Sequence, residues 1–246
     1  MGKIREILLL LSIQIGNTKL GMRILSVSLP PVLSCPGASV SCLKECFGRK
    51  SRYHSPVVQI SHKSNLEATK EIHFVEFAIE RFNSFRQRIV RVHAVGDFYE
   101  NEDGDPDQYV RDWQVIVDEL PDKHFYAYTR SWTVPSLKKE LRRLGNRSNF
   151  TMWLSCDHTM PEPPSYWDGF KRAYMSVADD DVPSFPVDLV FRAGSRKSPM
   201  KKDAAGNQIC PYEQGIRRKV QLTCSSCGIC FDHKPVYSIG QVKQLA

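Results

Sequence analysis

The stretch RIVRVHAVGD at residues 88–97 decides the fold of this chain of 246 residues. Its residues 88–95 predict a β-strand rich in valine and isoleucine, and Gly96-Asp97 ends the strand. Similar strands are expected on both sides of it, at residues 22–29, 56–61, 123–129, 150–155 and 186–192. Apolar residues at three- and four-residue steps predict helices between them, over 65–85, 106–120, 137–144 and 166–174.

This alternation predicts an α/β fold with a parallel sheet, in which the helices are the crossovers between strands. Six strands are too few for a closed eight-stranded barrel, so we expect a partial barrel. We expect an α/β body at residues 1–193, with a cysteine loop at 34–46. Residues 194–246 carry little hydrophobic core and are predicted to form a cysteine-rich extension packed on the body, which a metal would order.

Composition narrows the class of protein. The hydrophobic, aromatic and charged fractions of 41%, 10% and 25% are those of a soluble globular protein. The eight cysteines, in a long chain without a convincing export signal, favour free thiols in a reducing cytoplasm over a disulfide scaffold. The apolar run at 7–15 is too short to span a bilayer, so we expect a buried strand or helix there, or alternatively a targeting or interfacial segment.

Most of the net charge of +7 lies in residues 192–219. This segment contains eight basic and two acidic residues, which gives it a net charge of +6. A solvated connecting segment is one interpretation. The other is a surface for a polyanion such as nucleic acid. The second interpretation assigns nucleic-acid contacts to Arg196, Lys197, Arg217, Arg218 and Lys219.

The C-terminal cysteines have the spacing of a cluster motif. Cys224, Cys227 and Cys230 form C-x2-C-x2-C, the spacing of the first three ligands of a bacterial ferredoxin cluster. That pattern takes its remaining ligand from a remote Cys-Pro pair, and Cys210-Pro211 is the nearer of two such pairs. A tetrahedral zinc site, in which His233 could replace one cysteine, and free thiols remain as alternatives.

The N-terminal cysteines are spaced differently. Cys35, Cys42 and Cys46 form C-x6-C-x3-C in a loop that also holds Pro36 and Gly37. Three thiolates leave one coordination position open on a cluster or a zinc ion, where a substrate or cofactor could bind. We therefore expect chemistry at this loop and a structural role for the C-terminal set. A single cluster that takes ligands from both ends of the chain is the alternative.

Polar residues follow four consecutive strands of the predicted sheet. Because ligands of parallel sheets collect beyond the carboxyl ends of the strands, these residues are expected to form a polar rim next to the N-terminal cysteine loop. Singly, each has a simpler interpretation: His93 as an inward-facing histidine with a satisfied hydrogen bond, Asp97 and Asp157 as caps or turn residues. The expected rim residues are Gly96, Asp97, Thr129, Arg130, Ser131, Ser155, Asp157 and Arg192.

Several short motifs resemble the bacteriophage gene product 88 family from about residue 16 to 233. They are Asn17-Thr18-Lys19-Leu20-Gly21, Ser28-Leu29-Pro30, Cys35-Pro36-Gly37-Ala38, Cys42-x3-Cys46-Phe47, His93-x2-Gly96-Asp97-Phe98, Tyr126-x-Tyr128-Thr129-Arg130-Ser131-Trp132 and Cys227-Gly228-Ile229-Cys230. Each motif is short, but together they are specific. A phage protein of this kind would work in the cytoplasm of an infected host cell.

A more distant likeness is to radical S-adenosylmethionine enzymes. In those enzymes three cysteines in a loop after the first strand hold a 4Fe-4S cluster, whose open iron binds S-adenosylmethionine. The likeness implies that residues 94–97 take the place of the glycine-rich edge that binds the methionine group, and that the C-terminal cysteines form an auxiliary cluster site. The loop departs from the usual C-x3-C-x2-C spacing, and the chain has no Gly-Gly-Glu motif.

The leading hypothesis is an iron–sulfur protein with one or two clusters, and a radical-S-adenosylmethionine-like enzyme acting on a nucleotide or nucleic acid. In that hypothesis Asp97, Arg130 and Asp157 carry catalysis. The residues that bind the cofactor are Gly96, Thr129, Ser131, Ser155 and Arg192. The alternative is a non-enzymatic nucleic-acid-binding protein with a structural zinc or iron–sulfur site, and a third interpretation is a regulatory or host-interaction protein that has lost its chemistry.

Overall fold

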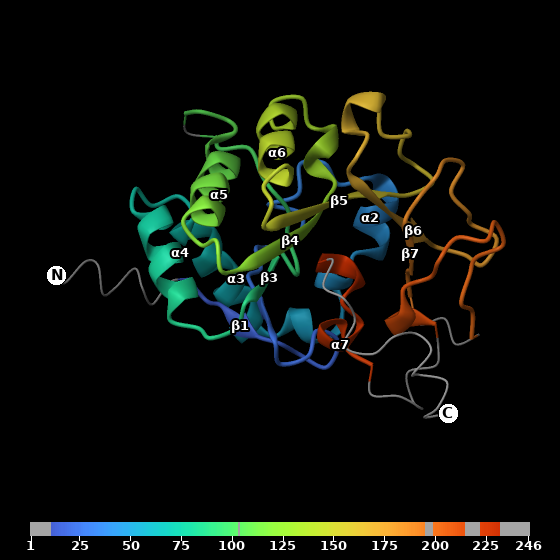
Figure 1. The fold of residues 1–246 in the computed structure, drawn as a ribbon, viewed down its shortest axis with the longest axis horizontal. Helices are drawn as coiled ribbons and strands as arrows, with labels where there is room; N and C mark the ends of the chain where they lie inside the picture. The colour runs from blue at the N-terminus through green and yellow to red at the C-terminus, as the bar shows by residue number, and fades with distance from the viewer. Residues whose placement is uncertain (1–10, 103, 195–198, 215–221, 232–246) are drawn as a thin grey trace.

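The computed structural model describes residues 11–102, 104–194, 199–214 and 222–231. Its centre is a seven-stranded sheet whose strands follow one another in chain order (Figure 1). The strands are β1 Gln14–Ile15, β2 Ile24–Ser26, β3 Ile89–Val92, β4 His124–Thr129, β5 Phe150–Cys156, β6 Lys171–Ser176 and β7 Leu189–Arg192. Only the β1–β2 pairing is antiparallel, and each later pair is parallel. The predicted α/β class with a mostly parallel sheet is therefore confirmed, while the partial barrel remains a prediction.

Helices cover one face of the sheet. Figure 1 shows α4 Phe74–Asn83, α5 Gln108–Asp118 and α6 Lys138–Gly145 in a row along one side of it. Beneath this row Phe82, Trp113 and Phe125 form a buried aromatic cluster, with ring centroids 5.9–6.3 Å apart. Burial of such large side chains is the main favourable term in the folding of the body.

The strand predicted at residues 56–61 is wrong, and the helix predicted at 65–85 is confirmed only in part. The expected strand at 56–61 is the first half of α3 Pro56–Ala68, and the expected helix at 65–85 is divided between α3 and α4. Pro56 stands at the first helical position, where its missing N–H costs nothing. The buried residues His62, Asn65 and Leu66 then follow a helical spacing, which the short segment at 56–61 does not reveal by itself.

The helix predicted at 166–174 is also wrong. A short 3-10 helix at Ser165–Trp167 is followed by β6, which pairs in parallel with both β5 and β7. Tyr174 lies in the core from this strand, next to Phe185. The aromatic spacing fits a helix as well as a strand, and pairing with neighbours distant in sequence decides between them.

The opposite face of the sheet is covered by the described parts of the C-terminal segment. Phe231 packs against Tyr126 with ring centroids 5.4 Å apart, and the Trp153 Nε1 donates a hydrogen bond to the Cys230 carbonyl (2.9 Å). Ile209 forms an isolated parallel β-bridge with Val190 of β7. These contacts attach residues 199–214 and 222–231 to the body; the division at residue 193 remains a prediction.

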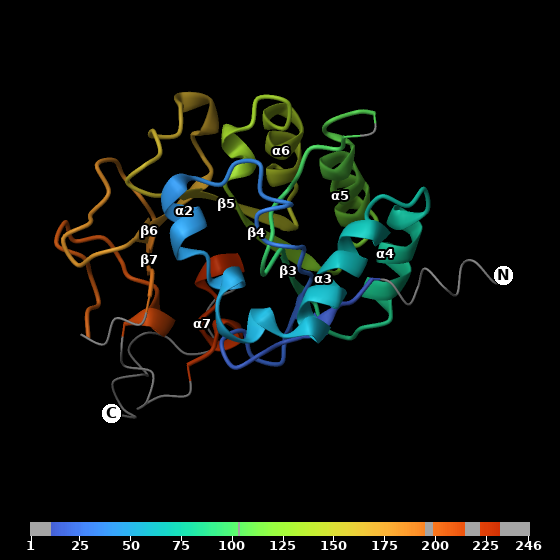
Figure 2. The same cartoon turned by 180° about the vertical axis from the view of Figure 1, so that it is seen from behind.

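Two shorter helices carry cysteines. α2 Val40–Glu45 contains Cys42 and is followed by Cys46, and α7 Cys224–Cys227 begins and ends on cysteines. In both views of the molecule α2 lies above α7 (Figures 1 and 2). No helix among the described residues is long and apolar enough to cross a membrane.

His93, just after β3, packs among aromatic side chains of the core. It follows β3 in a left-handed backbone conformation (φ 60°), is buried, and its Nε2 lies 2.8 Å from the Tyr109 hydroxyl. Burial lowers the pKa of His93 to about 3. The side chain therefore stays neutral in the folded protein at a pH where it is charged in the unfolded chain.

We expect this histidine to make the protein sensitive to acid. As the pH falls below about 6.5, His93 is protonated in the unfolded chain but stays neutral in the folded protein until about pH 3. The free energy of unfolding therefore falls between these two pH values. Urea unfolding at pH 6, 5 and 4 should show His93→Asn losing about 1.4 kcal/mol less per pH unit than the wild type. His54→Asn, at an exposed histidine, is the control. Parallel pH dependences for all three proteins would contradict this expectation.

Candidate metal centre

The N-terminal cysteine loop packs onto the carboxyl ends of the parallel strands. The Asp97 backbone N–H donates to the Ser34 carbonyl (3.1 Å), and the Leu29 N–H donates to the Val95 carbonyl (2.8 Å). Gly37 lies so close to β4 that a Cβ there would stand 2.2 Å from the Arg130 carbonyl oxygen. Only glycine allows the loop to approach the strand end so closely.

Asp97 organises the rim beneath this loop. Its buried carboxylate accepts hydrogen bonds from the Thr129 hydroxyl (2.6 Å) and from the backbone N–H groups of Arg130 and Phe98 (both 2.7 Å). Burial raises the pKa of Asp97 to about 6, against the opposing effect of these donors. The carboxylate thus joins the end of β3 to the end of β4.

A buried ion pair joins β4 to β5. The Arg130 guanidinium donates to the Asp157 carboxylate at 2.7 Å, and both side chains are almost fully buried. Asp157 also accepts hydrogen bonds from the hydroxyls of Ser39 and Thr159 (both 2.5 Å). Because Ser39 also caps α2 by accepting from the Cys42 N–H (3.0 Å), the ion pair fixes the position of the cysteine helix.

The thiols of this loop lie next to the charges of the rim. Burial raises the pKa of Cys35 to about 12, and the Asp97 carboxylate adds to the effect. Burial also raises the pKa of Cys42, although the Arg130 guanidinium opposes it. Both groups are therefore neutral thiols in the absence of a metal. A metal that bound here would have to displace their protons, so its affinity would rise with pH.

The C-terminal cysteines lie on the other face of the sheet, where residues 17–21 form their socket. The N–H groups of Cys224 and Ser225 donate to the carbonyls of Lys19 and Leu20 (2.8 and 2.9 Å). A Cβ on Gly21, whose φ is 78°, would stand 2.2 Å from the Ser225 hydroxyl oxygen. The segment at 19–21 and α7 therefore fit together only with glycine at position 21.

The C-terminal set consists of four cysteines whose thiols are all at least partly shielded from solvent. Burial raises the pKa of Cys230 to about 12 and raises that of Cys210, Cys224 and Cys227. Cys224 further raises the pKa of the other three thiols. The packing agrees with these effects: Cys230 shares one hydrophobic cluster with Cys210 and another with Cys224.

Two cations accompany this set. The Lys19 ammonium pairs with Glu213 at 2.8 Å, and Cys210 and Cys224 contribute to raising its pKa against the effect of burial. The Arg91 guanidinium lies 5.5 Å from the centre of the Tyr128 ring, and it opposes the rise in the pKa of Cys224 and Cys230. Its Nε is buried with no hydrogen-bond partner among the described residues. A buried nitrogen of this kind is costly unless an anion lies near it.

The model of the gene product 88 family matches residues 9–233. The chain belongs to the gene product 88 family. Neither the curated proteins nor the solved structures include a significant match to it.

The gene product 88 motifs converge on the two cysteine sites. Residues 17–21 form the socket of α7, in which the Asn17 side chain accepts from the Lys19 and Leu20 N–H groups (2.8 and 2.9 Å). The motifs at 35–38, 93–98 and 126–132 meet where Gly37 packs on Arg130 and Asp97 binds Thr129. The resemblance to radical S-adenosylmethionine enzymes receives no support from the comparisons.

The remaining predicted residues are placed as follows. Ser131 is buried and donates to the Phe98 carbonyl (2.6 Å), and the Ser155 carbonyl accepts from the Trp132 indole (3.0 Å). Arg192 ends the edge strand β7, its guanidinium binds Asp179 (3.0 Å), and its backbone N–H donates to Glu213. Arg196, Lys197, Arg217, Arg218 and Lys219, and also His233, lie outside the described residues.

Sequence reasoning missed three residues of these sites: Lys19, Ser39 and Arg91. Ser39 had a readable signal, because a serine three residues before Cys42 is the usual position for a helix cap. Lys19 and Arg91 had no such signal, because only the fold brings them close to cysteines that are far away in the sequence. In the described part of the chain, no three ligand side chains are already arranged to hold a metal ion.

Proposed function

We propose that the chain is an iron–sulfur protein with two cysteine sites. The observation that carries the proposal is the group of Cys210, Cys224, Cys227 and Cys230 beside the cations Lys19 and Arg91. Four buried neutral thiols would not need such cations. Four metal-bound thiolates would, because buried negative charge is stable only when it is compensated.

The donor set favours an iron–sulfur cluster over zinc at this site. The C-x2-C-x2-C spacing with a remote Cys-Pro is that of ferredoxin ligands, and α7 and the following 3-10 turn give the loop its curvature. Tetrahedral zinc on the same four thiols is the rival, and metal analysis separates the two. In either case the metal would hold the C-terminal segment on the sheet.

The N-terminal set supports a chemical role. Cys35, Cys42 and Cys46 would leave one position of a bound cluster open, and Asp97, Arg130 and Asp157 lie beside these thiols. A cluster there would supply single electrons to a molecule bound at the open position. We propose a radical-S-adenosylmethionine-like enzyme that acts on a nucleotide or nucleic acid, in which the rim positions the cofactor and Gly37 and Gly96 allow the close approach of the backbone.

The two sets favour two sites over one shared cluster. The pKa of Cys35 and of Cys42 responds to Asp97 and Arg130 at the carboxyl ends of the strands. The pKa of Cys210 and of Cys224 responds to Lys19 and Glu213 on the other face of the sheet. Different charged neighbours imply different environments for the two sets.

Protein produced without oxygen tests both parts of the proposal, the iron–sulfur clusters and the enzyme activity. It should be brown and contain iron and sulfide in nearly equal amounts, and a colourless protein loaded with zinc would exclude the iron–sulfur proposal. With dithionite and S-adenosylmethionine it should release 5′-deoxyadenosine. Cys42→Ser should abolish that release while Cys156→Ser, at the cysteine outside both sets, retains it. Iron without any release would refute the enzyme and leave the iron–sulfur protein.

A further inference from the structure

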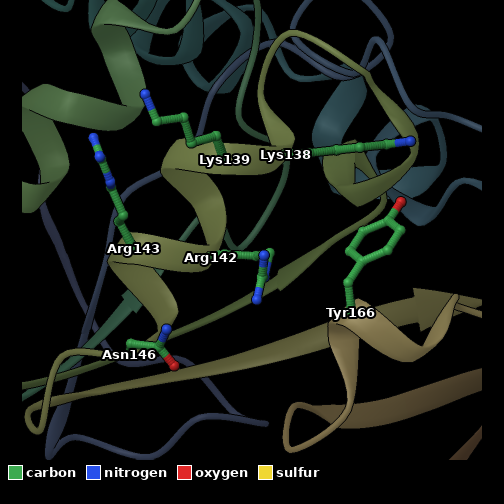
Figure 3. Close-up of a pocket in the computed structure, with 6 residues that line it drawn as sticks. All are labelled: Lys138, Lys139, Arg142, Arg143, Asn146 and Tyr166. Atoms are coloured by element: carbon green, nitrogen blue, oxygen red, sulfur yellow. The ribbon is translucent and has the colours of Figure 1, made fainter.

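A basic surface lies on α6, away from both cysteine sites. Its side chains surround a pocket of about 460 Å³ that is open to solvent (Figure 3). The lining residues are Lys138, Lys139, Arg142, Arg143, Asn146 and Tyr166. Residues four apart on a helix share a face, so the four cations form two rows, 138 with 142 and 139 with 143.

The two rows differ in their ion pairs. Arg143 and Lys139 approach the buried Glu140 carboxylate at 2.7 and 3.8 Å, which offsets part of their charge. Lys138 and Arg142 have no carboxylate partner within the described ranges. One row of α6 therefore offers two cations to an external anion.

Tyr166 completes this surface. Its ring centre lies 5.8 Å from the Lys138 ammonium and 5.9 Å from the Arg142 guanidinium, and Figure 3 shows the ring beside both side chains. Tyr166 is 40% exposed, although its neighbour Trp167 is fully buried and anchors the 3-10 helix that carries both residues. An exposed tyrosine beside two cations offers its free ring surface to a planar group.

Cations beside a stacking ring are what a single strand of nucleic acid requires. Its phosphates pair with lysine and arginine, and its unpaired bases stack on aromatic rings. Lys138 and Arg142 are about 6 Å apart along the helix axis, a separation of the order of neighbouring phosphates on one strand. A duplex keeps its bases stacked on each other and cannot use the tyrosine.

We propose that Lys138, Arg142 and Tyr166 form a binding surface for single-stranded nucleic acid, with phosphates on the two cations and a base on the ring. This surface shares no residue with the two cysteine sets or with the basic residues predicted to bind nucleic acid near the C-terminus.

Fluorescence anisotropy with a labelled dT12 oligonucleotide tests the surface. Lys138→Glu with Arg142→Glu should weaken binding at least tenfold and reduce the slope of log affinity against log salt by about 1.4 for two lost contacts. Tyr166→Ala should weaken binding about 5- to 100-fold, and Tyr166→Phe should not. Lys63→Glu with Lys70→Glu makes the same change in net charge at exposed lysines of another surface and is the matched control.

Three outcomes would overturn the proposal. One is equal weakening by the α6 pair and the control pair. Another is a full loss on replacing Arg217, Arg218 and Lys219 by glutamate while the α6 pair has no effect, which would place the nucleic acid near the C-terminus. The third is equal affinity for dT12, a 12-base-pair duplex and inorganic polyphosphate with no effect of Tyr166→Ala, which would mean attraction of any polyanion.

Discussion

Replacing Cys227 by alanine is expected to remove the metal of the C-terminal set and to destabilise the protein severely. The described residues 222–231 attach to the sheet through few buried side chains, chiefly Phe231, so most of their attachment would depend on the metal. We expect a loss above about 4 kcal/mol in the free energy of unfolding, or a fall in Tm of roughly 10 °C or more. Iron content and calorimetry of anaerobic protein measure both effects.

Cys156→Ala is the matched control for this variant. Cys156 is fully buried at the end of β5 and belongs to neither cysteine set. It should keep all of its iron and lose only the small cost of a cavity, about 1–2 kcal/mol. If Cys227→Ala retains its iron and melts within a few degrees of Cys156→Ala, the C-terminal set does not hold a metal.

The second large effect is expected at the buried ion pair of the rim. Arg130→Ala leaves the fully buried Asp157 carboxylate without its cation, and such a loss costs about 3–5 kcal/mol. The effect should also displace α2, because Asp157 binds Ser39, the cap of that helix. Urea unfolding measures the stability, and the reactivity of Cys42 toward a thiol reagent measures the displacement.

Arg147→Ala provides the comparison, since Arg147 pairs with Asp118 at 3.1 Å on the surface. Exposed pairs contribute about 0–1 kcal/mol, so this variant should be nearly as stable as the wild type. Combining Arg130→Ala with Asp157→Asn should recover part of the loss, because the uncompensated charge is removed. Equal stability of the Arg130→Ala and Arg147→Ala proteins would show that the pair does not fix the rim.

The sequence was sufficient to predict the centre of the sheet. β3, β4 and β5 are short apolar strands bounded by Gly96-Asp97, Arg130 and Asp157, and each lies where its pattern predicted. The errors lie at residues 56–61 and 166–174, where short apolar or aromatic runs fit either period. Pairing with strands far away in sequence decides such segments, and no local pattern contains that information.

The candidate sites were predictable to a similar degree. The rule that parallel strands end at one edge brought Asp97, Thr129, Arg130 and Asp157 together with the first cysteine loop, as the structure places them. Arg91 shows the limit of that rule. It stands on β3, only four residues before Val95, where the rim begins. Its side chain nevertheless points to the other face of the sheet, where it lies near cysteines that come more than a hundred residues later in the chain. Alternation along a strand separates these faces, but only the fold shows what covers each of them.

Iron counted per chain in three proteins tests the central claim most directly. The wild type, a variant with Cys35, Cys42 and Cys46 replaced by alanine, and one with Cys224, Cys227 and Cys230 replaced would each be produced without oxygen. Two independent 4Fe-4S sites predict about eight iron atoms in the wild type and about four in each variant. A wild type without iron, or complete loss of iron from both variants, would contradict two separate iron–sulfur sites.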